Sequence, residues 1–169
     1  IPPHCAPDES YHIQNIYQIS NRILGVSDIV GDGYVSMQEE DGEKYQKLDE
    51  IKVWDTISME RYRDVNYELF QKNTSAGYTA RPGKYTLENT TVWTYLPSTI
   101  GLCIARILDY NYVTMFMFAR WANLLVATFL IVIGIRKCPV GKRGMITIAL
   151  FPMFIQQSGS CSYDALILA

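Results

Sequence analysis

The chain has 169 residues, of which 49% are apolar and 19% are charged, and its formal net charge is −2. These averages conceal two unlike parts, because residues 1–100 hold 9 Lys/Arg and 15 Asp/Glu whereas residues 101–169 hold 6 Lys/Arg and 2 Asp. The asymmetry excludes one evenly solvated domain and indicates a membrane protein with a polar segment outside the bilayer, and the lack of strong basic runs argues against nucleic acid as a partner.

Residues 1–24 are predicted to form an acidic motif followed by an amphipathic helix. Pro7 precedes Asp8 and Glu9, an order that suits a helix start because proline fits the first turn and acids fit the positive end of the helix dipole. Isoleucines then recur at near-helical spacing until Gly25, where glycine favours helix termination.

Residues 25–92 are polar and mixed, and the sequence predicts an extracytoplasmic insertion with one or two solvated helices within 43–72 and a loop or short strand within 73–92.

Residues 93–112 change character. Trp93 and Tyr95 stand before Pro97, where we expect a helix to begin. Apolar residues on one side of that helix indicate that it lies along the bilayer surface; a soluble amphipathic helix is the alternative.

Residues 113–135 form an apolar run long enough to cross about 30 Å of hydrocarbon as a helix. The loop at 136–144 holds four cations, so the positive-inside rule places it in the cytoplasm. Residues 145–169 are then expected to hold a returning transmembrane helix, an outer turn and the start of the next span. Residues 1–112 accordingly lie outside the cytoplasm. The predicted fold class is a mostly α, polytopic membrane protein with an extracytoplasmic subdomain and an interfacial helix.

Asp8, Glu9 and His12 are the first candidate site. One helical turn separates Asp8 from His12, so the two side chains share a helix face. Two carboxylates and an imidazole suit proton transfer or a divalent cation, Mg²⁺ or Mn²⁺, held by Asp8 and Glu9. The alternative is an acidic helix cap beside a surface histidine.

Arg120 and Asn123 lie within the predicted span, and Arg106 lies on the interfacial helix. A charge in a span is costly, so it faces a cavity or a partner. Arg120 would bind a lipid phosphate, with Asn123 extending the polar lining; snorkelling or a pair with Asp164 are the alternatives for Arg120, and an interhelical hydrogen bond is that for Asn123. Arg106 would meet phosphate head groups or act as a plain interfacial anchor.

Ser160, Ser162 and Asp164 form a second polar cluster on the predicted outer face. They either contribute to a site or cap a helix, with Ser162 as the cap and Asp164 in the first turn. A disulfide between Cys5 and Cys161 would join the two clusters. Since the chain starts at Ile1 and stops at Ala169 within an apolar run, we expect a piece of a longer protein.

Several motifs together resemble the bacterial family called domain of unknown function 2142. They are the opening APDESYH, the stretch WTYLPSTIGLCIARIL, the segment ARWANLL, and KCPVGKRGMITIALFPMFIQQSGSCSYDALILA. The resemblance covers about residues 3–24 and 93–169, and 25–92 lie where such proteins vary. Tyr163 stands where proline or alanine is more usual.

That family is similar to C-type glycosyltransferases, which take sugar from a polyprenyl-phosphate carrier on the outer face of the membrane. The resemblance implies that residues 1–112 are the first outer loop and 113–135 the second span. It also implies that Asp8 or Glu9 is the catalytic base, assisted by His12, with Asp164 completing the site. Fold analogy does not fix activity.

The leading functional hypothesis is transfer of a sugar from a polyprenyl phosphate to an envelope glycan or lipid acceptor, in the bacterial inner membrane. One alternative is a membrane protein that binds or exports lipid-linked saccharides without catalysis. The other is a binding ectodomain, residues 25–92, on a membrane anchor.

Overall fold

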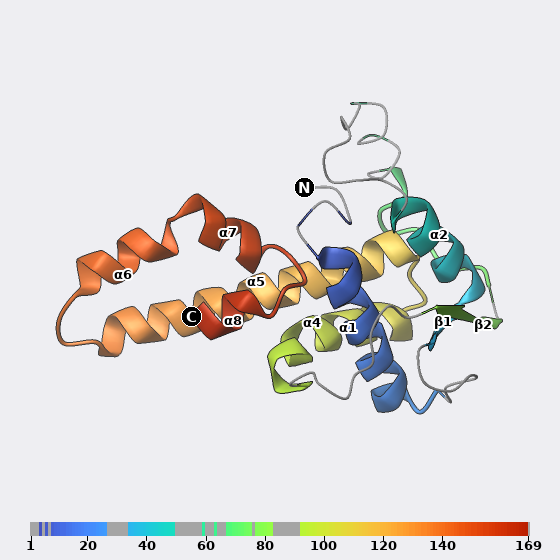
Figure 1. The fold of residues 1–169 in the computed structure, drawn as a ribbon, viewed down its shortest axis with the longest axis horizontal. Coiled ribbons are helices and arrows are strands. Elements are labelled where there is room, and N and C mark those ends of the chain that lie inside the picture. The colour runs from blue at the N-terminus through green and yellow to red at the C-terminus, as the bar shows by residue number, and fades with distance from the viewer. Residues whose placement is uncertain are drawn as a thin grey trace.

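The computed structural model describes residues 4, 6, 8–26, 34–49, 59, 63, 67–75, 77–82 and 92–168. Figure 1 shows a packed domain and a long helix that projects from it. The elements in chain order are α1 (Glu9–Leu24), β1 (Tyr34–Gln38), α2 (Glu39–Asp49), β2 (Tyr78–Pro82), α4 (Val92–Ile107), α5 (Tyr112–Lys137), α6 (Lys142–Ala149), α7 (Pro152–Ser158) and α8 (Asp164–Leu168). The chain is mostly helical, as its sequence predicts.

Helix α1 begins and ends as its sequence predicts. Asp8 is the residue before the first turn and Glu9 is the acid within it. At the other end, Gly25 has φ 69° and its N–H donates to the carbonyl of Asn21, the left-handed helix end that glycine adopts without strain. Ile13 and Ile16 on the inner face of the helix are fully buried.

Helix α4 begins at Val92, five residues before the expected start at Pro97. Pro97 therefore lies inside the second turn, where it removes one backbone hydrogen bond without ending the helix. Gly101 lets α4 approach α5 closely, since a Cβ at this position would overlap the backbone oxygen of Phe118 and lie 2.8 Å from the Cβ of Ala122.

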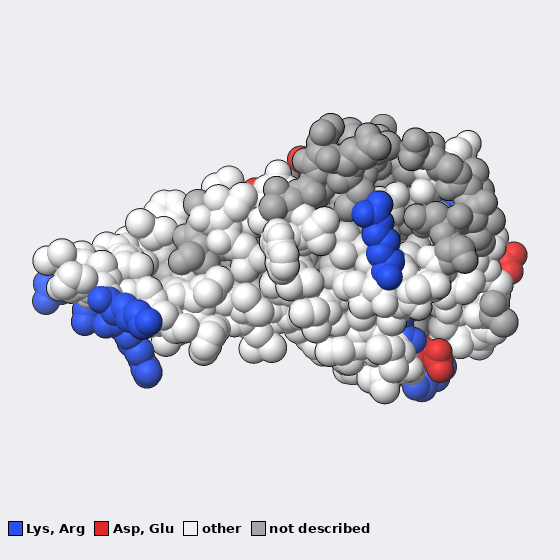
Figure 2. All heavy atoms as spheres, turned by 90° about the horizontal axis from the view of Figure 1, so that it is seen from below, with Lys and Arg blue, Asp and Glu red and all other residues white. Residues whose placement is uncertain are grey.

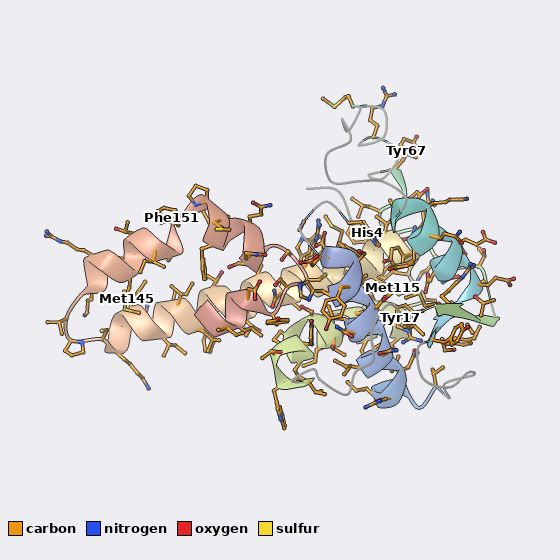
Figure 3. All side chains as sticks on the ribbon, in the orientation of Figure 1. His4, Tyr17, Tyr67, Met115, Met145 and Phe151 are labelled. Atoms are coloured by element: carbon orange, nitrogen blue, oxygen red, sulfur yellow. The ribbon has the colours of Figure 1, made fainter. Side chains whose placement is uncertain are left out.

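The hydrophobic core lies among α1, α4 and the first third of α5, and buried side chains of β1 and α2 also contribute to it. Figure 3 shows Tyr17 and Met115 within this packed region, and both side chains are buried. Strands β1 and β2 pair antiparallel, with Ser36 opposite Ala80. The amide of Asn21 on α1 donates to the backbone carbonyl of Ser36 (2.7 Å), which attaches this sheet to the helical core.

Helix α5 has 26 residues and is the one helix in the described part of the chain that is long and apolar enough to span a membrane. Asn111 caps its start by accepting from the backbone N–H of Thr114 (3.1 Å). Beyond the core, α5 exposes large apolar side chains such as Leu125 (70%) and Phe129 (64%). Helices α6 and α7 turn back alongside α5 (Figure 1), with a break at Leu150 and Phe151 before Pro152.

The far end of α5 and the start of α6 carry the four cations of the predicted cytoplasmic loop. Arg136, Lys137, Lys142 and Arg143 are all exposed. Figure 2 shows Lys and Arg side chains gathered at this end of the molecule, with no acidic side chain among them on the face shown.

We expect Gly101→Ala to lower the free energy of unfolding by about 1–3 kcal/mol, because the added methyl group overfills the α4–α5 contact. Gly144→Ala in α6 is the matched control, since nothing lies within 4 Å of a Cβ there. Thermal unfolding in detergent measures both variants. Equal melting temperatures for G101A and the unchanged protein would contradict the close contact.

A second prediction concerns the buried carboxyl of Asp41 on α2, which accepts hydrogen bonds from Tyr17 (2.7 Å) and Asn73 (3.0 Å). Burial raises the pKa of Asp41 to about 7, outweighing the Tyr17 hydrogen bond and the positive charge of Arg106. The folded protein therefore holds a proton that the unfolded chain releases above its ordinary pKa of 3.8. Stability from this group is fully present below about pH 4 and falls as the pH rises to about 7.

Asp41→Asn should remove this pH dependence, because an amide does not ionise. Relative to the unchanged protein, the variant gains up to about 1.4 kcal/mol of unfolding free energy per pH unit between pH 4 and 7. Chemical unfolding of both proteins at a series of pH values measures the difference between their free energies of unfolding. The other carboxylates contribute equally to both proteins, so their effects cancel. Parallel stability curves for the two proteins would show that Asp41 ionises normally in the fold.

Candidate functional site

The N-terminus of α1 and the turn at 158–164 meet in space although they are far apart in the chain. The backbone N–H of Cys161 donates to Glu9 Oε1 (3.4 Å), a contact across 152 positions. The structure thus brings together the two polar clusters that the sequence predicts for the outer face. Cys5 lies outside the described residues, and Cys161 is a buried free thiol.

A buried ion pair between Glu9 and Arg120 joins α1 to α5. Arg120 Nε donates to Glu9 Oε1 (2.8 Å) and Nη2 donates to Oε2 (2.6 Å). The two side chains are 0% and 6% exposed respectively. Glu9 also accepts from the backbone N–H of Ala6 (3.3 Å), and the guanidinium lies 4.6 Å from the ring centre of Phe116. Arg120 therefore has Glu9, and not Asp164, as its carboxylate partner.

Asp8 is the exposed carboxylate of the cluster. Its backbone is left-handed, with φ 54° and ψ 14°, and its side chain makes no cap hydrogen bond to α1. Aspartate tolerates this conformation better than most residues. The Asp8 carboxylate consequently stands at the start of α1 with its oxygens available to a ligand, whereas the oxygens of Glu9 are engaged.

His12 lies one turn further along α1 and is buried (6% exposed). Its Nδ1 is 2.7 Å from the hydroxyl of Tyr95 on α4, and its ring makes an edge contact with Tyr163 at 5.3 Å between centroids. Burial lowers the pKa of His12, outweighing the opposing charges of Asp164, Asp8 and Glu9. The imidazole is therefore neutral at pH 7.

Asn123 and the two serines organise the turn before α8. The Asn123 amide donates to the backbone carbonyls of Ser160 (2.9 Å) and Ser162 (3.0 Å). Ser162 Oγ accepts from the backbone N–H of Asp164 (3.1 Å), as an N-cap does. Asp164 is partly exposed. Its charge acts on His12 and opposes the lowering of the His12 pKa by burial.

Arg106 lies elsewhere, between α1, α4 and β2. Its guanidinium donates to Asn21 Oδ1 (2.8 Å), to the Ser20 hydroxyl and to the Tyr78 hydroxyl (3.4 Å). It also lies 4.4 Å from the ring centre of Tyr17. With 8% of its surface exposed, Arg106 faces the protein interior and is separate from the cluster around Glu9.

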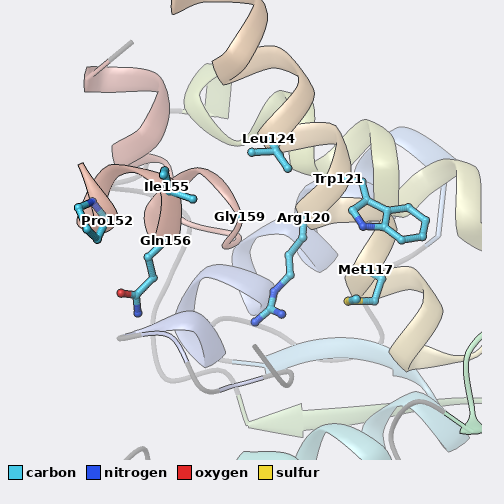
Figure 4. A pocket seen from close by; sticks show the side chains of 8 residues that line it. All are labelled: Met117, Arg120, Trp121, Leu124, Pro152, Ile155, Gln156 and Gly159. Atoms are coloured by element: carbon cyan, nitrogen blue, oxygen red, sulfur yellow. The ribbon is translucent and has the colours of Figure 1, made fainter. Parts of the chain in front are cut away.

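A groove of about 570 Å³ runs between α5 and α7, and Arg120 is the charged side chain among the described residues that line it (Figure 4). Gln156 supplies a polar amide on the α7 side. The other lining residues are Met117, Trp121, Leu124, Pro152, Ile155 and Gly159. Arg120 lines the groove and also pairs with Glu9, so this side chain links the groove to the cluster at the start of α1.

The described residues do not assemble a ligand set for the expected divalent cation. Both oxygens of Glu9 accept from Arg120, so a cation bound by Asp8 and Glu9 would have to share the Glu9 carboxylate with the guanidinium. Within the described ranges, no three His, Cys, Asp or Glu side chains are grouped as metal ligands.

Two contacts of this site are absent from the sequence-based prediction. One is the pairing of Glu9 with Arg120, and the other is the hydrogen bond from His12 to Tyr95. The cost of a charge within a span did indicate that Arg120 needs a partner, but charge alone does not choose between Glu9 and Asp164. Nothing in the local pattern marks Tyr95 as a partner of His12.

The fold and the site define a mostly helical protein, in which a polar cluster lies where a packed domain meets a helix long and apolar enough to span a membrane. The chain belongs to the family described as Predicted membrane protein (DUF2142), whose sequence model matches residues 1–169. This match confirms the resemblance inferred from the motifs. Comparisons with curated proteins and with solved structures gave no match.

Proposed function

We propose that this protein is a glycosyltransferase that moves a sugar from a polyprenyl-phosphate donor to an envelope glycan or lipid acceptor. One observation carries the proposal: the exposed carboxylate of Asp8 and the neutral imidazole of His12 belong to the same cluster as Glu9, and the ion-pair partner of Glu9, Arg120, lines an apolar groove. Sugar transfer from a polyprenyl phosphate needs an apolar surface for the lipid chain, a positive charge for the phosphate and polar groups for the acceptor hydroxyl, close to one another.

The groove supplies the surface that a polyprenyl chain requires. Its walls are mainly apolar, and it continues onto the exposed apolar face of α5, so a lipid can enter sideways from the bilayer. At the inner end, the donor phosphate would meet the Arg120 guanidinium and the Gln156 amide. Glu9 holds the guanidinium in place through two hydrogen bonds, which reduces the reorganisation that phosphate binding needs.

The proposed reaction is a single displacement. The acceptor hydroxyl oxygen attacks the anomeric carbon and forms the new glycosidic bond, while Asp8 takes the hydroxyl proton. The bond between the anomeric carbon and the phosphate oxygen breaks, and its electron pair leaves with the polyprenyl phosphate. Solvent then removes the proton from Asp8. The partial exposure of Asp164 would let it orient the acceptor through hydrogen bonds.

We also propose that the protein is a multi-pass protein of the bacterial inner membrane, with residues 1–112 outside the cytoplasm. Aromatic side chains at one end of the exposed part of α5, with Trp121 contacting Phe70 and Phe118, and cations at the other end support this orientation. Alkaline phosphatase fused after residue 85 should be active and the same fusion after residue 140 inactive. The reverse pattern would overturn the orientation.

Purified protein in proteoliposomes, given a radiolabelled polyprenyl-phosphate sugar and a cell-envelope glycan fraction, tests the proposed activity. We expect label to move into the glycan only when the protein is present. Donor binding without transfer would support the alternative of a protein that binds or exports lipid-linked saccharides. Glycan binding that needs 25–92 and no donor would support the ectodomain alternative.

A further inference from the structure

The geometry points to Tyr95 as a positioning residue that fixes His12 in the tautomer with its proton on Nε2. The inference rests on the proposed function for its role in catalysis, whereas its structural part depends only on the hydrogen bonds and the burial of the two side chains. Tyr95 is fully buried on α4, and its hydroxyl lies 2.7 Å from His12 Nδ1.

The direction of this hydrogen bond follows from a second contact of the same hydroxyl. The Asn15 amide nitrogen donates to the Tyr95 oxygen (3.5 Å), and an amide nitrogen can only donate. Among the described residues, Asn15 and His12 are the groups that bond the Tyr95 hydroxyl. The hydroxyl proton therefore has His12 Nδ1 as its acceptor.

The opposite direction is unfavourable. If Nδ1–H donated to Tyr95, the hydroxyl proton would have no acceptor in a fully buried position, which costs about 1–3 kcal/mol. Since burial also keeps His12 neutral, the imidazole has one proton, and that proton is on Nε2. The backbone of Tyr95 is held in turn, because Thr99 Oγ1 donates to its carbonyl (2.9 Å).

The Nε2–H group is placed to serve a ligand. His12 Nε2 makes no hydrogen bond to the described part of the chain, and it is not sealed from solvent. Because the Tyr95 hydroxyl binds Nδ1, Nε2 is the ring nitrogen that remains for a ligand. His12 thus acts as a hydrogen-bond donor to a sugar or phosphate oxygen, which leaves the role of base to Asp8.

Nitrogen-15 NMR of the full chain in detergent tests the tautomer directly. The chain has two histidines, so His12→Gln assigns the signals. We expect the Nδ1 signal of His12 to be that of an unprotonated nitrogen and the Nε2 signal that of a protonated one. A protonated Nδ1 in the unchanged protein would overturn the inference, whatever the outcome of any transfer assay.

Tyr95→Phe removes the hydroxyl and should convert His12 to a mixture of tautomers, with helicity by circular dichroism retained. Tyr112→Phe is the matched control, because the Tyr112 hydroxyl lies 2.8 Å from Nε2 of the other histidine, His4. That variant should change the His4 signals and leave those of His12 unchanged. A folded Y95F protein with the unchanged His12 tautomer would contradict the positioning role.

In the transfer assay, Y95F should lower kcat more than it raises KM for the donor, because His12 would still be present but wrongly protonated in part of the molecules. If NMR shows the expected tautomer in the unchanged protein and its loss in Y95F, while neither protein transfers sugar, the proposed function is wrong and the positioning role of Tyr95 is supported. An unchanged kcat in a Y95F protein with mixed tautomers would show that the tautomer of His12 does not contribute to sugar transfer.

Discussion

Glu9→Ala is expected to lower the free energy of unfolding by about 3–5 kcal/mol, because it leaves the Arg120 guanidinium buried without its carboxylate. The pair joins α1 to α5 and is almost fully removed from solvent, so water cannot replace the lost partner. Arg120→Ala should destabilise the protein by a similar amount, since it leaves the Glu9 carboxylate buried. Chemical unfolding in detergent measures both variants.

A double variant separates the loss of the ion pair from the loss of packing. Glu9→Leu combined with Arg120→Met replaces both charges with apolar side chains, and such replacements are often neutral or stabilising. We expect this protein to recover most of the stability lost by either alanine variant. A loss below about 1 kcal/mol in E9A, as for an exposed pair, would contradict the burial of this contact.

Local sequence rules predicted the helices that depend on local signals. The acids at 8 and 9 and the glycine at 25 bound α1 as expected, and the apolar run from 113 to 135 lies within α5. These features follow from capping and from hydropathy, which act over a few residues. The helix start expected at Pro97 is wrong, because α4 already begins at Val92 and a proline in the second turn is tolerated when the preceding turn is helical.

Contacts between distant residues were beyond such rules. Glu9 and Arg120 are 111 positions apart, and the sequence offers Asp164 as an equally charged partner. Arg106 has the sequence context of an interfacial anchor, yet the packing of α4 against α1 turns it toward Ser20 and Asn21. The side of a helix that meets a partner is set by tertiary packing, which periodicity does not specify.

Asp8→Asn is expected to reduce the rate of sugar transfer by about 10²–10⁴-fold, the usual contribution of a general base. The stability of the protein should not change, because the carboxylate is exposed and makes no cap hydrogen bond. Asparagine also tolerates the left-handed backbone at this position. The substitution therefore removes the proton acceptor and little else.

Asp109→Asn is a closely matched control for this variant. Asp109 is also an exposed aspartate with a left-handed backbone (φ 55°). Its N–H donates to the carbonyl of Arg106 at the end of α4, and it is not among the described residues that line the groove. D109N should transfer sugar at the rate of the unchanged protein. It reproduces the change in charge and the backbone conformation without touching the proposed site.

The most direct test is the initial rate of sugar transfer from a radiolabelled polyprenyl-phosphate donor in proteoliposomes, measured for the unchanged protein, D8N and D109N at equal amounts of inserted protein. The proposed mechanism predicts transfer by the unchanged protein and by D109N, and a loss of at least about 100-fold for D8N. Equal rates for D8N and D109N would contradict the assignment of Asp8 as the base.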